Sequence, residues 1–148
     1  MSSYTRLLQF YQHFRKFYAR QFSPLLEQTG LSIHEVDVLL FLANNPGYDT
    51  ARDIAVLRGL SKSLISQSVE LLAAEGLLRR IPDSADRRVV HLAITPEGLP
   101  LAQEAQRIQN ACGQRLMEGF SPQEAALFQS FLERILDNGD ALNEEVSQ

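Results

Sequence analysis

The residues whose types could do chemistry fall in two short polar clusters in the middle of the chain. In the first, Ser61, Lys62 and Ser63 stand where a helix is expected to begin, and the free amide hydrogens and dipole of a helix N-terminus favour a phosphate. One turn further on come Ser66 and Gln67, and glutamine can pair with N6 and N7 of adenine through two hydrogen bonds. We predict phosphate contacts from the first three residues and base contacts from the last two. A glutamine that is only solvated is the alternative for Gln67.

The second cluster is a polar turn that begins at Pro82. Arg87 and Arg88 lie on its far side, and a protruding hairpin can carry guanidinium groups into a narrow minor groove. Asp83 and Asp86 are placed to hold one of these arginines in position. The alternative is that Asp86 and Arg87 form a surface ion pair of little energetic consequence. We predict a minor-groove contact for the two arginines.

Charge is distributed unevenly around these clusters. The net charge is −4, yet residues 52–92 carry seven Lys and Arg against five Asp and Glu, whereas residues 93–148 carry three against nine. A basic middle between acidic flanks can place an anion-binding surface on an acidic protein. Arg52, Arg79 and Arg80 belong to this middle and are predicted to contact phosphate or to support the hairpin; of these, Arg52 and Arg80 complete the predicted DNA-binding set.

Periodic apolar residues identify the elements that must position the clusters. They predict helices over about 4–27, 32–45, 50–58, 61–75 and 95–116 and a last helix from 121, with strands at 77–81 and 90–94 and a frayed tail from Gly139. Ser32 with Glu35 is a capping box, and Gly59 supplies a left-handed residue between two short helices. The order predicts a mainly α fold with a small β-hairpin wing, a winged helix-turn-helix flanked by terminal helices.

Four segments together resemble the MarR-type bacterial transcriptional regulators. They read LSKS at 60–63, EGLLRR at 75–80, DSADRR at 83–88 and LAITPEG at 92–98. The resemblance implies a DNA-binding lobe at 31–95 and a helical dimerisation region at 1–30 and 96–148. It also implies a homodimer that places a recognition helix in each major groove of a pseudo-palindromic operator. We expect a repressor of a bacterial operon.

Two interpretations fit the aromatic face of the first helix. The first is a dimer interface, formed by Leu7, Phe10, Phe14, Leu116, Phe120, Phe128, Phe131, Leu132 and Ile135. The second follows from the family resemblance, which implies that a small aromatic or phenolic anion binds between the lobe and the terminal helices and lowers DNA affinity. The residues predicted to line that pocket are His13, Phe14, Arg15, Phe17, Tyr18 and Phe41, with Arg15 and His13 as partners of the anion.

Other classes of function lack their residues in this sequence. Cys112 is the only cysteine, so neither an intramolecular disulfide nor a thiolate cluster is possible, and a reducing cytoplasm is expected. His13, His34 and His91 have no metal-ligand spacing, and no nucleophile–base pair or glycine-rich phosphate loop is present. We expect no catalytic residue, metal, cofactor or membrane segment. An enzyme acting through Cys112 and a histidine is the least favoured option.

A rival to DNA binding is a winged-helix module that binds another protein. Fold alone does not dictate function, and the wing and polar helix face could serve either role. Small polar residues, a lysine near the helix start and paired wing arginines suit phosphate better than a protein interface, whose centre is rich in buried aromatic residues. The sequence therefore favours a homodimeric, sequence-specific DNA-binding regulator.

Overall fold

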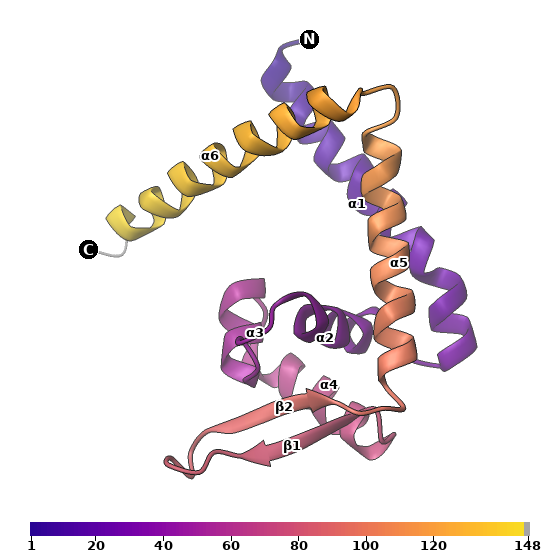
Figure 1. Cartoon of the computed structure of the whole chain (residues 1–148), viewed down its shortest axis with the longest axis vertical. Coiled ribbons are helices and arrows are strands. Elements are labelled where there is room, and N and C mark those ends of the chain that lie inside the picture. The colour runs from indigo at the N-terminus through magenta and orange to yellow at the C-terminus, as the bar shows by residue number, and fades with distance from the viewer. Residues whose placement is uncertain (147–148) are drawn as a thin grey trace. The chain divides into compact units, whose positions relative to one another are not determined.

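The computed structural model describes the backbone of residues 1–146 and side chains up to residue 142, so the last two residues of the predicted dimerisation region lie outside it. The elements in chain order are α1 (Ser3–Thr29), α2 (Ile33–Asn44), α3 (Ala51–Arg58), α4 (Lys62–Ala74), β1 (Leu78–Pro82), β2 (Val90–Ile94), α5 (Leu99–Leu116) and α6 (Pro122–Val146) (Figure 1). The predicted order of helices and strands is confirmed. The chain divides into two units, Met1–Cys112 and Gly113–Gln148, which are described separately below.

Side-chain caps fix where the helices of the first unit begin. Ser32 and Glu35 form the predicted capping box of α2. Thr50 caps α3 and forms a second capping box with Asp53, whose carboxylate accepts from the Thr50 backbone N–H at 3.0 Å. At the other end of α3, Gly59 has φ +62°, the left-handed conformation predicted for it.

The start of α5 differs from its prediction. The sequence placed it at Thr95-Pro96, but the helix begins at Leu99, because residues 95–98 form a turn. In this turn the Thr95 hydroxyl donates to the Gly76 carbonyl oxygen at 2.6 Å, and the Gly98 N–H donates to the Thr95 hydroxyl at 3.1 Å. Gly98 is required here, since a Cβ atom would lie 2.1 Å from the carbonyl oxygen of Leu77.

The tail prediction was also wrong in part. The frayed segment expected from Gly139 is instead a continuation of α6, which extends to Val146. A single glycine costs only about 1 kcal/mol in a helix, and the alanine, leucine and glutamates that follow it favour the helical state.

The two strands form an antiparallel hairpin that is attached to the lobe at its base. Leu78 pairs with Ile94 and Pro82 with Val90, which sets the register. Leu78 and Leu92 turn into the core, and the Leu92 N–H donates to the carbonyl oxygen of Asp49, just before α3, at 2.7 Å. The turn of the hairpin extends beyond α3 and α4 (Figure 1).

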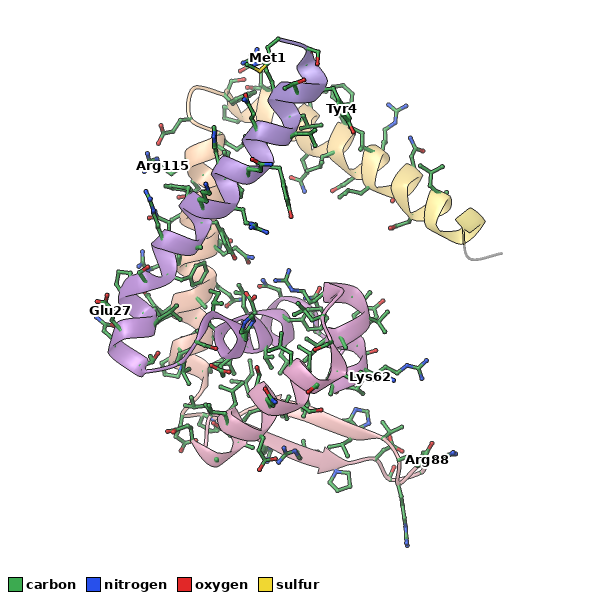
Figure 2. The ribbon with its side chains drawn as sticks, turned by 180° about the vertical axis from the view of Figure 1, so that it is seen from behind. Met1, Tyr4, Glu27, Lys62, Arg88 and Arg115 are labelled. Atoms are coloured by element: carbon green, nitrogen blue, oxygen red, sulfur yellow. The ribbon has the colours of Figure 1, made fainter. Side chains whose placement is uncertain are left out.

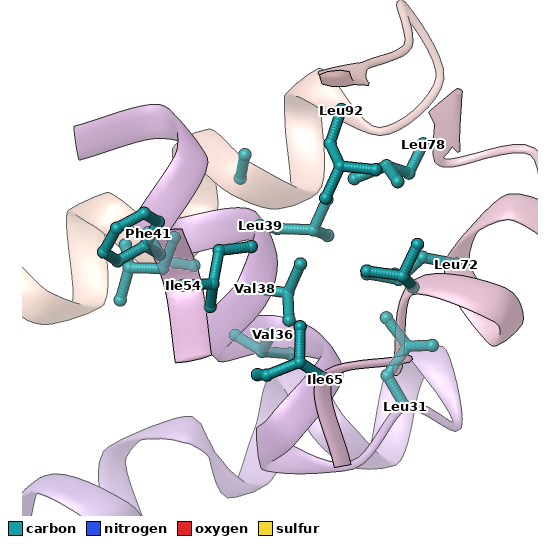
Figure 3. Close-up of a cluster of buried hydrophobic side chains, with 14 of the residues drawn as sticks. Leu31, Val36, Val38, Leu39, Phe41, Ile54, Ile65, Leu72, Leu78 and Leu92 are labelled. Carbon is teal, nitrogen blue, oxygen red and sulfur yellow. The ribbon is translucent and has the colours of Figure 1, made fainter. Parts of the chain in front are cut away.

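The core of the first unit lies where α2, α3, α4 and the hairpin meet. Val38, Leu39, Ile65 and Leu72 are each at most 1% exposed and pack in one cluster (Figure 3). Near this cluster the buried Glu35 carboxylate accepts from the Ser68 hydroxyl at 3.2 Å, which ties α2 to α4. Helix α4 is thereby fixed by apolar packing and one buried hydrogen bond.

Candidate nucleic-acid interface

The N-terminus of α4 is built as predicted from Ser61, Lys62 and Ser63. The Ser61 hydroxyl accepts from the Leu64 N–H at 3.2 Å and caps the helix. All three residues are exposed, and Figure 2 shows Lys62 at the start of the helix. The cap satisfies one N–H and leaves others of the first turn for water or an anion.

One face of α4 is polar and exposed along its length. Ser66 and Gln67 each lie three or four residues from both Ser63 and Glu70, so the four side chains lie on the same side of the helix. The Glu70 carboxylate accepts from the Arg80 guanidinium of β1 at 2.7 Å. Arg80, a predicted phosphate contact, therefore has an acidic partner that the sequence analysis missed, and this pair ties the helix to the hairpin.

The turn of the hairpin is ordered by its two aspartates, which act differently. Asp83 accepts from the backbone N–H groups of Ala85 and Asp86, both at 2.8 Å. Asp86 accepts from the backbone N–H of Arg88 at 2.9 Å and from its guanidinium at 3.3 Å. Asp86 therefore holds one of the two wing arginines, Arg88, as the sequence analysis predicted. The Asp86–Arg87 ion pair considered as an alternative does not form, and within the described residues Arg87 has no acidic partner.

His91 provides a link that sequence analysis did not find. Its Nδ1 lies 2.7 Å from a carboxylate oxygen of Asp49, and its Nε2 lies 3.0 Å from one of Asp83. The bonds to Asp49 and Asp83 raise the pKa of the ring. The bond from His91, followed by those from the backbone of the turn, lowers the pKa of Asp83 to about 2. Asp49 is 42 residues away from His91 in sequence, so local spacing carried no signal for this pairing.

Every predicted DNA contact lies at the surface of the first unit. The exposed set is Arg52, Ser61, Lys62, Ser63, Ser66, Gln67, Arg80, Arg87 and Arg88. It comes from α3, α4 and the hairpin, and Arg88 lies at the hairpin tip (Figure 2). These exposed residues are cations and small polar groups, and we call the set the basic face. Whether each of them contacts DNA stays a prediction.

A separate cavity of about 520 Å³ lies within the first unit between α1, α2, α3 and α5. Of the six residues predicted for a ligand pocket, Tyr18 and Phe41 line it, whereas the other four lie elsewhere on α1. The Gln109 amide donates to the Tyr18 hydroxyl at 3.2 Å, and Arg58 pairs with Asp37 at 3.4 Å. Burial raises the pKa values of both Tyr18 and Asp37.

The lining residues that the sequence analysis missed share one property, since they lie outside α1, on α2, α3 and α5 or in the loop after α2. They are Asp37, Leu40, Asn44, Asn45, Tyr48, Leu57, Arg58 and Gln109. Only the packing of four helices brings these positions to one cavity. The predicted cationic partners of an anion, Arg15 and His13, do not line it, and Arg58 does.

The described residues contain neither a metal-binding cluster nor a membrane-crossing helix. No group of three or more His, Cys, Asp or Glu side chains there could hold a metal ion. None of the helices in the same residues has the length and apolar character needed to cross a membrane. Cys112 is buried on α5.

Comparisons with known proteins agree on one family. The family model described as MarR family matches residues 29–89. The transcriptional regulator PA3341, whose crystal structure is known, is 31% identical in sequence to this chain. The match covers 93% of this chain and 97% of PA3341, with a TM-score of 0.74. No curated protein matches the chain in sequence.

Two further solved structures share the fold at lower identity. Streptococcus pneumoniae FabT, in complex with DNA, is 20% identical over 95% of this chain and 99% of its own, with a TM-score of 0.72. The DNA binding of Bordetella bronchiseptica BpsR is regulated by 6-hydroxynicotinic acid. BpsR is 22% identical to this chain, and the match covers 88% of this chain and 98% of BpsR with a TM-score of 0.64. The family model and PA3341 show that the chain belongs to the MarR family, whose members are DNA-binding transcriptional regulators and not enzymes.

Proposed function

We propose that this regulator binds a pseudo-palindromic operator as a homodimer, represses transcription of a bacterial operon, and is released by a small aromatic or phenolic anion. In this proposal residues 31–95 form the DNA-binding lobe, and residues 1–30 and 96–148 form the dimerisation region. The observation that carries DNA binding by this lobe is the basic face, in which cations and small polar groups of α3, α4 and the hairpin are exposed and three of them lie at the N-terminus of α4.

Dimerisation is supported by apolar side chains exposed at both ends of the chain. Leu7 and Phe10 on α1 are 60% and 47% exposed, and Phe131 and Ile135 on α6 are 53% and 65% exposed. Large apolar patches of this kind mark interaction surfaces. A second copy is the proposed partner because a two-fold dimer presents two recognition helices, and an operator with two half-sites matches that symmetry. The half-sites are then expected about 34–36 Å apart.

The test is binding of the purified protein to random-sequence duplex DNA across a salt series, followed by sequencing of the bound pool. With about eight phosphates neutralised per dimer, the log–log salt slope is expected near −7. An enriched palindrome supports the operator proposal. A steep slope without enrichment contradicts sequence specificity, and absence of binding at low salt favours the protein-binding module.

Two substitutions separate the roles within the basic face. Arg87→Ala is expected to weaken binding on every sequence, because a guanidinium in the minor groove contacts features shared by many sequences. Gln67→Ala is expected to relax preference at one base pair, worth about 1–3 kcal/mol. Both are measured on the enriched duplex and its single-base variants. Equal losses from both changes on all duplexes would contradict this division.

Repression is tested with a reporter gene placed behind the enriched operator. Expression is expected to fall when the regulator is produced and to stay unchanged with a scrambled operator. A rise in expression that needs the intact operator would identify an activator instead.

The cavity of the first unit is the proposed effector site. Tyr18, Phe41 and Tyr48 supply aromatic walls, and Arg58 supplies a cation whose present partner is Asp37. An aromatic carboxylate can stack on these rings and compete with Asp37 for Arg58. The regulation of BpsR by 6-hydroxynicotinic acid, a small aromatic acid, supports the same ligand class here.

This part is tested by titrating the protein–DNA complex with 4-hydroxybenzoate. DNA affinity is expected to fall in the wild type and to respond less in Arg58→Gln, because the variant lacks the cation. The matched control is Arg15→Gln on α1, outside the cavity. If the ligand leaves DNA affinity unchanged, the proposed class of ligand is wrong. If the response is lost only in Arg15→Gln, the ligand binds at the α1 residues that the sequence analysis predicted and not in this cavity.

A further inference from the structure

The ring of His91 lies between two carboxylates that belong to different parts of the lobe. Asp49, at 2.7 Å from Nδ1, is in the segment that leads into α3. Asp83, at 3.0 Å from Nε2, is in the turn of the hairpin. The histidine on β2 therefore joins the hairpin turn to the start of the helix-turn-helix.

This geometry sets the protonation state of the ring. An ionised carboxylate only accepts hydrogen bonds, and a neutral imidazole carries one N–H and one unprotonated nitrogen. Both bonds can form together only when both ring nitrogens carry hydrogen, which is the imidazolium cation. Asp49 and Asp83 are the charged groups that act on the ring. The backbone of His91 pairs with Ile81 of β1 and with Thr50, and both of these residues are uncharged.

The bonds of His91 continue to the tip of the hairpin. Asp83 also accepts from the backbone of Ala85 and Asp86, and Asp86 in turn holds Arg88. A connected set of hydrogen bonds thus runs from Asp49, two residues before α3, to a cation at the hairpin tip. When the ring loses a proton, one of its two carboxylates loses its donor, and this connection between α3 and the turn is broken.

We propose that His91 is a positioning residue whose imidazolium holds the wing turn against the start of α3, so that DNA affinity falls as the pH rises and the ring becomes neutral. The proposal rests on the proposed function in that the wing must contact DNA. It adds a pH dependence and a positioning role that the basic face alone does not contain.

The directions of the two pKa shifts determine how the stability of the His91 link changes with pH. The pKa of His91 is raised above 6.5, so its contribution to stability is full below about pH 6.5 and is lost as the pH rises through the raised value. The pKa of Asp83 is lowered from 3.8 to about 2, so its contribution is full above about pH 3.8 and is lost as the pH falls through about 2. The link is therefore complete in mildly acidic solution and weakens above it.

The first experiment measures affinity for a fluorescent duplex carrying the enriched sequence, from about pH 5.5 to about pH 8.5 at constant ionic strength. Affinity of the wild type is expected to fall about threefold to tenfold more over this range than that of His91→Gln, the scale of one hydrogen bond. His34→Gln is the matched control, since His34 is exposed on α2, and its profile should follow the wild type. An unchanged pH profile in His91→Gln would overturn the proposal.

The second experiment needs no DNA and separates failure of this proposal from failure of DNA binding. Ring-¹⁵N NMR of the full chain should show one histidine whose pKa is raised, so that it keeps both ring nitrogens protonated at pH values above about 6.5, where an ordinary histidine becomes neutral. Its signals should be absent in His91→Gln. Amide exchange at Ala85 and Asp86 is expected to quicken as that histidine titrates, beyond the ordinary base-catalysed increase seen in His91→Gln. A His91 ring with a single N–H at pH 6, or turn amides that do not respond to its titration, would refute the positioning role even if the protein binds DNA.

Discussion

The winged helix-turn-helix lobe and the terminal helices differ in how far they bury their apolar residues. In the lobe, Leu39, Ile65 and Leu72 are at most 1% exposed. On α6, Phe128 and Phe131 are 48% and 53% exposed, although they are as apolar as the core residues. The lobe therefore encloses a core made from its own chain, whereas the apolar face of α6 is left exposed, which is typical of an interaction surface.

The same contrast occurs along the single helix α1. Phe22 and Leu25 near its C-terminal end are buried in the core of the first unit. Leu7 and Tyr11 near its N-terminal end are 60% and 64% exposed. Apolar periodicity is continuous through both halves, so the pattern indicates an amphipathic helix without saying what covers each half.

The largest expected effect is in the core of the lobe. Leu72→Ala is expected to lower the free energy of unfolding by about 2–5 kcal/mol, because it leaves a cavity at a fully buried site. Urea denaturation followed by circular dichroism measures the change. The control is Leu71→Ala, since Leu71 is the next residue on α4 and is 41% exposed. Similar losses for the two variants would mean that the lobe does not enclose the core described above.

A charge on the apolar face of α6 tests the other region. Phe131→Glu is expected to weaken dimerisation by about 30-fold, corresponding to the roughly 2 kcal/mol of an interface hot spot. Sedimentation over a concentration series measures it. Ser130→Glu is the control because it adds the same charge about 100° around the helix from Phe131, away from the apolar face. An unchanged dimer in Phe131→Glu, or equal weakening in both variants, would contradict the proposed interface.

The sequence was most informative where an interaction is local. The cap at Ser61, the box at Ser32 and Glu35 and the left-handed Gly59 all involve residues within three or four positions of one another, and all were predicted correctly. The start of α5 was misplaced because Thr95 bonds to Gly76, a contact set by the packing of the hairpin base. No local pattern signals such a bond.

The candidate site likewise contains features that a local sequence pattern predicts and features that depend on tertiary packing. The exposure of Lys62, Gln67 and Arg87 could be predicted from the expected helix and turn, whereas their contacts with DNA stay a prediction. The partners His91–Asp49 and Arg80–Glu70 join separate elements, and the cavity needs Arg58 and Gln109 from different helices. These pairings depend on tertiary packing, which a single sequence does not reveal.

The smallest expected effect compares the N-caps of the two regions. Ser61→Ala is expected to lower the free energy of unfolding by about 1 kcal/mol, since the Leu64 N–H loses its acceptor in a helix that is packed in the lobe core. Ser2→Ala removes the same kind of cap from α1, where the Ser2 hydroxyl accepts from the Thr5 N–H among exposed residues. The loss should be smaller there, because that end of α1 can fray without disturbing a core. Urea denaturation of both variants measures the difference, and equal losses would contradict it.

Ser61→Asp separates the cap from the proposed phosphate contact at the same position. Aspartate caps a helix about as well as serine, so the free energy of unfolding should stay within a few tenths of a kcal/mol of the wild type. Its negative charge at the start of α4 should nevertheless repel a DNA phosphate and reduce affinity for every duplex. Loss of stability without loss of affinity would make Ser61 a structural cap only, whereas stable protein with weakened binding requires a phosphate close to the N-terminus of α4.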